Sequence, residues 1–202
     1  MNHWDEKYQT EDYFYGKEAN AYLQSIFNRP TNQHEKVVLF AEGEGRNAVY
    51  LADLGYDVTT YDTSEKGIAK QQRLASEKGV EIEAHLGDIT AEDAVPKDTY
   101  DYSINIFGHV PSEEKAMMFT NLVSSLVPHG HSYFEFYAKD QLQMGTGGPK
   151  DIDMLYDVSE IKAILATLPV YIHALDQHQV VRNEGSKHRG EGIVIQGHIE
   201  KI

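Results

Sequence analysis

The sequence predicts an α/β protein with a doubly wound, mostly parallel sheet of seven strands that ends in an antiparallel hairpin. Apolar stretches of strand length alternate with amphipathic stretches of helix length, which is the pattern of successive β-α-β units. The last two expected strands, 171–182 and 192–201, are joined by a segment too short for a crossover helix, so they should pair antiparallel. The chain of 202 residues is long enough for a single domain of this kind.

Five further strands are expected before the hairpin. The run 37–41 is continuously apolar, as expected for a central strand that is buried on both faces of a sheet. The other four are expected over 57–61, 82–86, 100–107 and 132–137.

Capping residues and glycines mark the expected helices between these strands. Ser64 can cap a helix that runs to Lys78 and ends at Gly79. Ser159 can cap a short helix before the hairpin in the same way. Further helices are expected over 19–27, from about 46 to 54, and over 112–126.

The first 30 residues are expected to form an aromatic lid and a helix, and residues 31–202 to form the main part of the same domain. Trp4, Tyr8 and Tyr15 belong to an aromatic-rich stretch that suits a cover over a binding site, where it would exclude water. The alternative is that these side chains simply cover the core. The stretch is polar and has no signal-peptide core, so a cytoplasmic protein is expected.

Charge and composition argue against several classes of partner. The net charge is −14, from 18 basic and 32 acidic residues, and such a field repels nucleic-acid backbones. No apolar run is long enough to span a bilayer, so no membrane partner is expected. Nothing in the sequence indicates an oligomeric state.

Metal binding is not expected either. The chain has no cysteine, which removes thiolate ligands together with disulfides and cysteine nucleophiles. Its ten histidines form no recognised ligand motif. His129 and His131 lie around an expected turn, while His173 and His178 are too far apart to share a site within one strand.

The most informative segment is the glycine-containing loop 42–48, between the first strand and its helix. In Rossmann-like sheets this position borders the ligand crevice. Gly43 permits a tight turn, and Gly45 would let the backbone approach a ligand closely. The loop formally satisfies the Gly-x-Gly-x-x-Gly/Ala pattern of dinucleotide-binding proteins.

Charge separates the candidate cofactors of this loop. Glu42 and Glu44 flank the glycines and would face the pyrophosphate of a dinucleotide. Two unit charges about 4 Å apart, at an effective dielectric constant of about 20, repel by about 4 kcal/mol. S-adenosylmethionine has no phosphate and carries an ammonium and a sulfonium, so the acidic loop favours it over NAD.

Two further strand ends support a nucleoside. Asp62 closes the second strand, where a carboxylate can accept both ribose hydroxyls. Its alternative role is that of an acidic residue at the start of the next helix. After the third strand, Asp88 offers a carboxylate to the adenine amino group and Ile89 offers an apolar side chain to the ring.

These residues resemble the class I S-adenosylmethionine-dependent methyltransferases, and in particular their TehB-like, tellurite-resistance-type branch. The motifs that carry the resemblance include Trp4-Asp5-x-x-Tyr8, residues 42–47, 61–64, 87–88, 107–112, 128–130 and 147–149. The resemblance implies that Gly43, Gly45, Asp62, Asp88 and Ile89 hold the cofactor and that the aromatic segment covers it. The chain departs from the family's usual Asp-x-Gly-Cys-Gly loop, which here reads Ala-Glu-Gly-Glu-Gly over residues 41–45.

We therefore expect in-line methyl transfer from S-adenosylmethionine to a small-molecule acceptor. The alternatives are a non-catalytic module that binds the same cofactor and an NAD-dependent oxidoreductase. His109 is the candidate general base, and packing or capping is its alternative role. The expected cofactor residues are Glu42, Gly43, Glu44, Gly45, Asn47, Asp62, Thr63, Asp88, Ile89, Asn105, Phe107 and Tyr15, and the expected acceptor residues are Trp4, Tyr8, Tyr137, Gln141 and Gly148.

Overall fold

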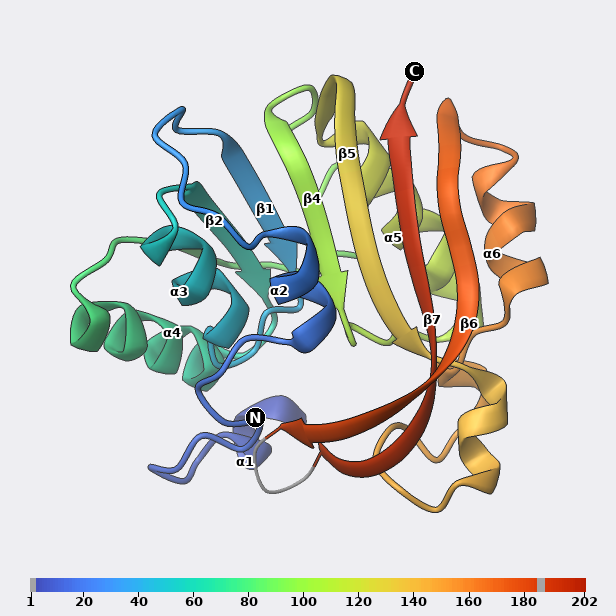
Figure 1. Cartoon of the computed structure of the whole chain (residues 1–202), viewed down its shortest axis with the longest axis horizontal. Coiled ribbons are helices and arrows are strands. Elements are labelled where there is room, and N and C mark those ends of the chain that lie inside the picture. The colour runs from blue at the N-terminus through green and yellow to red at the C-terminus, as the bar shows by residue number, and fades with distance from the viewer. Residues whose placement is uncertain (1–2, 185–187) are drawn as a thin grey trace.

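A computed structural model describes residues 3–184 and 188–202 of the chain, and it contains one seven-stranded sheet (Figure 1). The strands lie in the order β3-β2-β1-β4-β5-β7-β6. The pairs from β3 to β5 are parallel, and β7 pairs antiparallel with both β5 and β6. The strands are β1 (Lys36–Phe40), β2 (Asp57–Asp62), β3 (Glu83–Leu86), β4 (Tyr100–Ile106), β5 (Leu126–Tyr137), β6 (Val170–Glu184) and β7 (His188–Lys201). The expected fold class, including the terminal hairpin, is confirmed.

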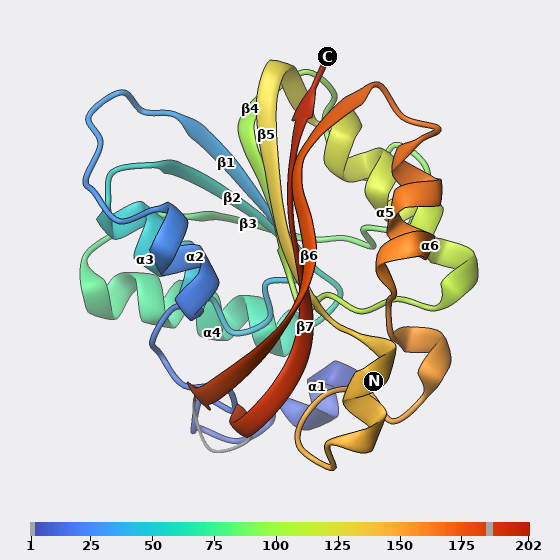
Figure 2. The same cartoon turned by 45° about the vertical axis from the view of Figure 1, so that its right-hand side comes forward.

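Helices cover both faces of the sheet. Figure 2 shows α2, α3 and α4 on one side and α5 and α6 on the other. Their bounds are α1 (His3–Lys7), α2 (Ala21–Ile26), α3 (Arg46–Asp53), α4 (Glu65–Lys78), α5 (Ser112–Ser124) and α6 (Val158–Leu165), with short 3-10 helices η1 (Lys139–Gln143) and η2 (Ile152–Met154). No helix within 3–184 and 188–202 combines the length and apolar character needed to cross a membrane.

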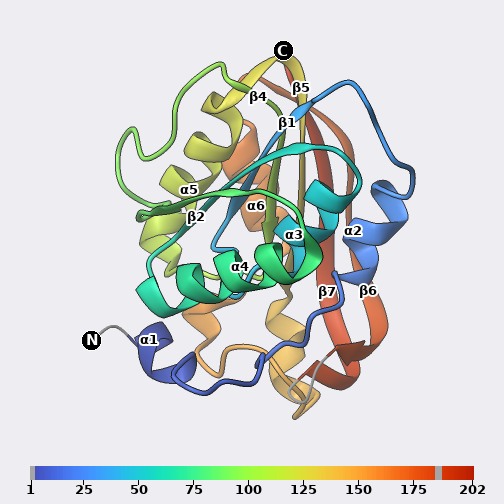
Figure 3. The ribbon, with the colours of Figure 1, turned by 90° about the vertical axis from the view of Figure 1, so that its left-hand side faces the viewer.

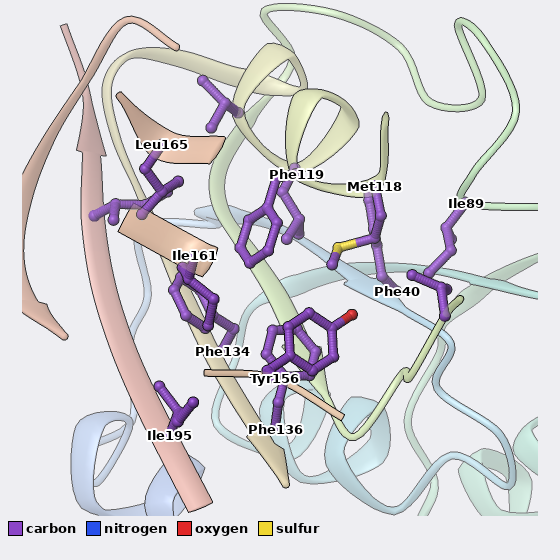
Figure 4. Close-up of a cluster of buried hydrophobic side chains, with 14 of the residues drawn as sticks. Phe40, Ile89, Met118, Phe119, Phe134, Phe136, Tyr156, Ile161, Leu165 and Ile195 are labelled. Carbon is purple, nitrogen blue, oxygen red and sulfur yellow. The ribbon is translucent and has the colours of Figure 1, made fainter. Parts of the chain in front are cut away.

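A large apolar core lies between the sheet and helices α5 and α6 (Figure 4). Phe119 of α5 packs against Phe134 and Phe136 of β5, and Tyr156 stacks on Phe136 with ring centroids 4.2 Å apart. A second cluster on the opposite face joins α2 and α3 to β1 and β4. Because both faces of the central strands are buried, these strands hold the loops at their carboxyl ends in fixed positions.

Several element boundaries differ from the expected ones for local reasons. The cap of α6 is Asp157, whose side chain accepts from the Glu160 N–H, while Ser159 lies inside the helix. β5 begins at Leu126 rather than at residue 132. The turn expected around His129 is therefore part of the strand, and His129 has a left-handed backbone conformation. Residues 185–187 of the expected hairpin turn lie outside the described residues.

The N-terminal segment passes along one end of the domain. In Figure 3 it runs from α1, below α4, to α2. The parallel strands β1, β2 and β4 end on this side, so the segment lies across the edge at which a doubly wound sheet binds its ligands.

Candidate active site

A cavity of about 640 Å³ lies at the carboxyl ends of the parallel strands, under the N-terminal segment. Ligand sites usually have volumes of roughly 300–1,000 Å³. Its walls come from the loops after β1, β2, β3 and β4, from the end of β5 and residues 147–149, and from residues 3–15. Ala41 and Phe107, which follow β1 and β4, have left-handed backbones with φ of 51° and 60°. Such strain at a non-glycine residue is characteristic of functional sites.

The cavity brings most of the predicted site residues together. The predicted base His109 lines it, as do the following cofactor and acceptor residues: Glu42, Gly43, Asn47, Asp62, Thr63, Asp88, Ile89, Phe107, Tyr15, Trp4, Tyr8, Tyr137 and Gly148. Four predicted residues are not part of the lining: Glu44, Gly45, Asn105 and Gln141.

Glu42 occupies the amino-terminal end of α3. Its Oε1 accepts from the backbone N–H groups of Asn47 and Ala48, at 2.9 and 2.8 Å. These amides are the donors that a bound phosphate would use at this position. Burial raises the pKa of Glu42 from 4.5 to about 7, against the lowering effect of these hydrogen bonds and of Arg46. The start of α3 therefore already holds an acidic side chain in place of an anionic ligand.

Asp62 is held at the end of β2 by the backbone of two neighbouring loops. Its Oδ2 accepts from the Gly43 N–H at 2.7 Å, and its Oδ1 accepts from the Ser64 N–H at 2.8 Å. The Thr63 backbone N–H is a further donor to this carboxylate, whose two oxygens can together accept about four hydrogen bonds. Burial raises the pKa of this carboxyl. Asp62 lines the cavity, so its carboxylate can accept from a ligand hydroxyl there.

Glu44, which was expected to face the ligand, is not among the residues that line the cavity, and its carboxylate has other partners. Its carboxylate accepts from the backbone N–H groups of Phe14 and Tyr15, and Oε1 also accepts from the Lys70 ammonium at 2.7 Å. The acidic loop therefore has two separate tasks. Glu42 closes the start of α3, and Glu44 fixes the N-terminal segment.

Gly45 is not part of the cavity lining, and the absence of a side chain there allows α3 to pack closely on α4. It has a φ of 94°, and a Cβ atom there would lie 2.8 Å from the backbone Cα of Gln71 in α4. Gly43 behaves differently, since its added Cβ would lie 2.8 Å from the Tyr8 hydroxyl at the cavity wall. Gly45, the second glycine of the loop, therefore allows the start of α3 to lie close to α4.

Asn105 and Gln141 shape loops next to the cavity. Asn105 Oδ1 accepts from the Gly108 N–H at 2.9 Å, which closes the turn after β4. Gln141 Oε1 accepts from the Ile193 N–H at 2.7 Å, and its Nε2 donates to the carbonyl of Thr146 at 3.1 Å. Both side chains are buried, and each one fixes the backbone of a loop that borders the cavity.

His109 lies in the cavity wall with both ring nitrogens close to backbone groups. Its Nδ1 is 2.7 Å from the Met154 carbonyl oxygen, and the Tyr137 N–H donates to its Nε2 at 3.3 Å. Burial lowers the pKa of His109 from 6.5 to about 4. A neutral imidazole with its acceptor nitrogen engaged is a weak base, so this environment favours the packing role. The general-base role stays a prediction.

The N-terminal aromatic side chains surround a lysine that the sequence analysis did not single out. Lys7 Nζ lies 4.5 Å from the Trp4 ring centroid and 4.7 Å from that of Phe14, and it donates to the Tyr15 hydroxyl at 2.9 Å. Trp4 also stacks on Tyr8, four residues later. The spacing of residues 4, 7 and 8 is that of one helical face, which is a signal that the sequence contained.

Two residues of the hairpin contact residues that line the cavity, although they are not part of the lining themselves. The Arg182 guanidinium lies 4.1 Å from the Phe107 ring centroid and 4.4 Å from that of Tyr137. Glu184 binds the Arg46 guanidinium at 2.6 Å. No local signal indicates these contacts, because they depend on the long curved hairpin returning to the site (Figure 1).

Comparisons with known proteins agree with this arrangement. A family model described as a methyltransferase domain matches residues 37–130. The probable S-adenosyl-L-methionine-dependent methyltransferase TehB of Haemophilus influenzae is 36% identical over 70 residues, which are 35% of this chain and 24% of that protein. The matched segment thus spans about a quarter of the length of the curated relatives.

Solved structures show the same fold over nearly the whole chain. The crystal structure of TehB from Haemophilus influenzae has a TM-score of 0.70 at 19% identity and covers 98% of this chain and 66% of that one. Magnesium protoporphyrin IX methyltransferase from Synechocystis PCC 6803, solved with bound S-adenosylhomocysteine, has a TM-score of 0.65 at 19% identity, over 90% of this chain and 79% of that one.

Residues 37–130 thus match a methyltransferase domain, and the fold of the chain is that of solved methyltransferases. Over 70 residues the chain is also similar in sequence to TehB, in agreement with the resemblance of its motifs.

Proposed function

We propose that the protein binds S-adenosylmethionine in the cavity and transfers its methyl group to a small-molecule acceptor. The choice of cofactor rests on the position of Glu42. Its carboxylate already accepts hydrogen bonds from the backbone N–H groups at the start of α3. A dinucleotide would have to displace a buried carboxylate to place its pyrophosphate there. A cofactor without phosphate has no such conflict, and its ammonium is compatible with an acidic wall.

The residues at the strand ends fit the nucleoside part of this cofactor. Asp62 lines the cavity at the end of β2, and its carboxylate can accept from the ribose hydroxyls in this proposal. Ile89 is buried in the cavity wall and offers an apolar contact to a base. Asp88 is exposed beside it and offers a carboxylate to an exocyclic amino group. In this proposal Glu42 and Gly43 face the amino-acid end.

The acceptor would lie between the N-terminal segment and the end of β5. Trp4, Tyr8, Tyr137 and Gly148 line this part of the cavity, together with the Lys7 cation. Residues 3–15, which line the cavity, act in this proposal as a lid that excludes water. A cavity closed in this way admits a small molecule and excludes a folded macromolecule or a duplex.

S-adenosylmethionine, when bound, supplies a methyl group already activated by a positively charged sulfur. The chain then has to orient the two reactants in line and keep water out. A base is needed only for an acceptor that arrives protonated. Because His109 has a pKa of about 4, the site suits acceptors that are already strong nucleophiles near neutral pH, such as thiolates or other soft chalcogen anions.

Calorimetry with S-adenosylhomocysteine and NADH tests the cofactor. We expect saturable binding of S-adenosylhomocysteine and none of NADH, and the reverse result would overturn the proposal. A panel of thiols, tellurite, selenite and small amines, with methylated product detected by mass spectrometry, then tests the reaction. Tight cofactor binding without turnover of any acceptor would favour a non-catalytic module.

A further inference from the structure

Three histidine side chains gather on the sheet at the end opposite to the cavity. They come from the middle of β5, the start of β6 and the end of β7. One ring nitrogen from each of His131, His173 and His198 lies within 4.8 Å of the others. We refer to these residues as the three-histidine cluster. It is separate from the candidate active site, which lies at the carboxyl ends of β1, β2 and β4.

The strand register brings the cluster together. Tyr133 pairs across from His198, and His131 pairs across from Glu200, so alternation places these four side chains on one face. The register between β6 and β7 shifts at His173, and such a bulge re-aims a side chain. The three histidines are far apart in sequence, which explains why spacing along the chain did not reveal them.

The ring positions are close to those of ligands on one metal ion. His131 Nδ1 and His198 Nε2 are 3.1 Å apart. Metal–nitrogen bonds of about 2.0–2.1 Å in a tetrahedron place two ligand atoms roughly 3.3 Å apart. The His173 ring stacks on the His198 ring with centroids 4.5 Å apart, and one of its nitrogens lies within 4.8 Å of the other two ligand atoms. We propose that the three-histidine cluster binds a divalent late transition-metal ion, with Zn²⁺ as the reference ion.

Glu200 completes the surroundings of this site. Its Oε2 is 2.8 Å from His173 Nε2, and its Oε1 is 3.0 Å from His129 Nδ1. A carboxylate on the second nitrogen of a ligand histidine fixes the tautomer and the orientation of the ring. It also places a negative charge beside the ion. Three imidazoles with one carboxylate suit Zn²⁺, Co²⁺, Ni²⁺ or Cu²⁺ better than Mg²⁺ or Ca²⁺.

An ion can reach the cluster directly from solvent. The His173 side chain is 34% exposed, and His131 and His198 are half-buried. Figure 1 shows β6 and β7 facing the viewer with no helix of the described chain in front of them near the C-terminus. The bound ion would join β5, β6 and β7, so it would stabilise the antiparallel end of the sheet.

Calorimetric titration of the tag-free, EDTA-treated and dialysed protein with ZnCl₂ at about pH 7.5 tests the proposal. We expect one equivalent to bind and the Tm to rise by several degrees. His173→Gln should weaken Zn²⁺ binding at least tenfold and abolish the Tm shift, since it removes the most exposed ligand with little effect on packing. Glu200→Gln should weaken binding about tenfold, as loss of a partner of a ligand histidine does. Bound Co²⁺ should give the visible absorption of a tetrahedral site.

His34→Gln is the matched control. His34 is also exposed and has a carboxylate neighbour, Asp57, at 3.3 Å, but it is not part of the cluster. It should bind Zn²⁺ as the unaltered chain does. Absence of one-to-one binding by the unaltered chain, or equal affinity in His173→Gln and His34→Gln, would overturn the proposal. Circular dichroism confirms that each variant is folded.

Discussion

The Glu44 carboxylate lies 2.7 Å from the Lys70 ammonium, and their side chains are only 2% and 7% exposed. Lys70 also donates to the Asp12 carbonyl at 2.7 Å, while Glu44 accepts from two backbone N–H groups in the same segment. One buried ion pair therefore fastens the proposed lid to the loop before α3 and to α4. A buried pair of this kind adds little stability over apolar residues, but a single unpaired member is costly.

The first prediction concerns this pair. Lys70→Ala should lower the free energy of unfolding by about 3–5 kcal/mol, because it leaves the Glu44 carboxylate buried without its partner. Urea denaturation measures this loss, and hydrogen exchange of residues 3–16 should become faster. Lys17→Ala is the control, since the Lys17–Glu77 pair is about half exposed and should contribute no more than about 1 kcal/mol. Equal losses in the two variants would contradict the prediction.

The role of Glu44 shows where prediction from sequence stops. The alternation of strands and helices predicted the sheet and its hairpin, and strand ends located Asp62, Asp88 and Phe107 at the cavity, because backbone periodicity is a local property. The partner of Glu44 lies 26 residues away on a different helix. The direction of a side chain in a loop is set by such distant partners. Because these partners are not visible in the sequence, Glu42 and Glu44 were both expected to face the ligand.

The same limit applies to the hairpin. The sequence predicted two antiparallel strands but not their register or the bulge at His173. The register of β7 against β5, which pairs His131 with Glu200 and Tyr133 with His198, could not be derived from the sequence either. The curvature that returns Arg182 to Phe107 is also a property of the folded sheet.

The second prediction concerns the pH dependence of stability. Glu42 has a folded-state pKa of about 7, raised from 4.5 by burial. Between these pH values the folded chain binds more protons at this group than the unfolded chain, so its contribution to stability falls as pH rises. Glu42→Gln keeps an acceptor for the α3 amides and removes the ionisation. Its stability relative to the unaltered chain should rise by about 2–3 kcal/mol from about pH 5 to about pH 8, as measured by urea denaturation.

Glu77→Gln provides a control of opposite sign. Hydrogen bonding from Lys17 lowers the pKa of Glu77, so this group contributes stability above pH 4.5 that is lost as pH falls. Glu77→Gln should therefore lose relative stability as pH rises through its acidic range. A stability difference for Glu42→Gln that stays constant with pH would show that Glu42 is ionised throughout.

The third prediction concerns the cofactor. Asp62→Ala should weaken binding of S-adenosylhomocysteine by about 1–3 kcal/mol, because charge-assisted hydrogen bonds to the ribose are lost. Calorimetry measures this change. Asp57→Ala, at the opposite end of the same strand, is the control and should bind as the unaltered chain does. Unchanged affinity in Asp62→Ala would mean that the ribose lies elsewhere in the cavity.

The fourth prediction concerns His109. Burial holds its pKa near 4, so the imidazole should stay neutral above about pH 5, with its Nδ1 proton donated to the Met154 carbonyl. Long-range proton–nitrogen NMR can detect this tautomer and its titration without any assay of activity. For an acceptor that turns over, His109→Gln should reduce kcat by less than about tenfold, since loss of a general base typically costs 10²–10⁴-fold. Titration of His109 near pH 6.5, together with a loss of kcat in that larger range, would instead establish it as the base.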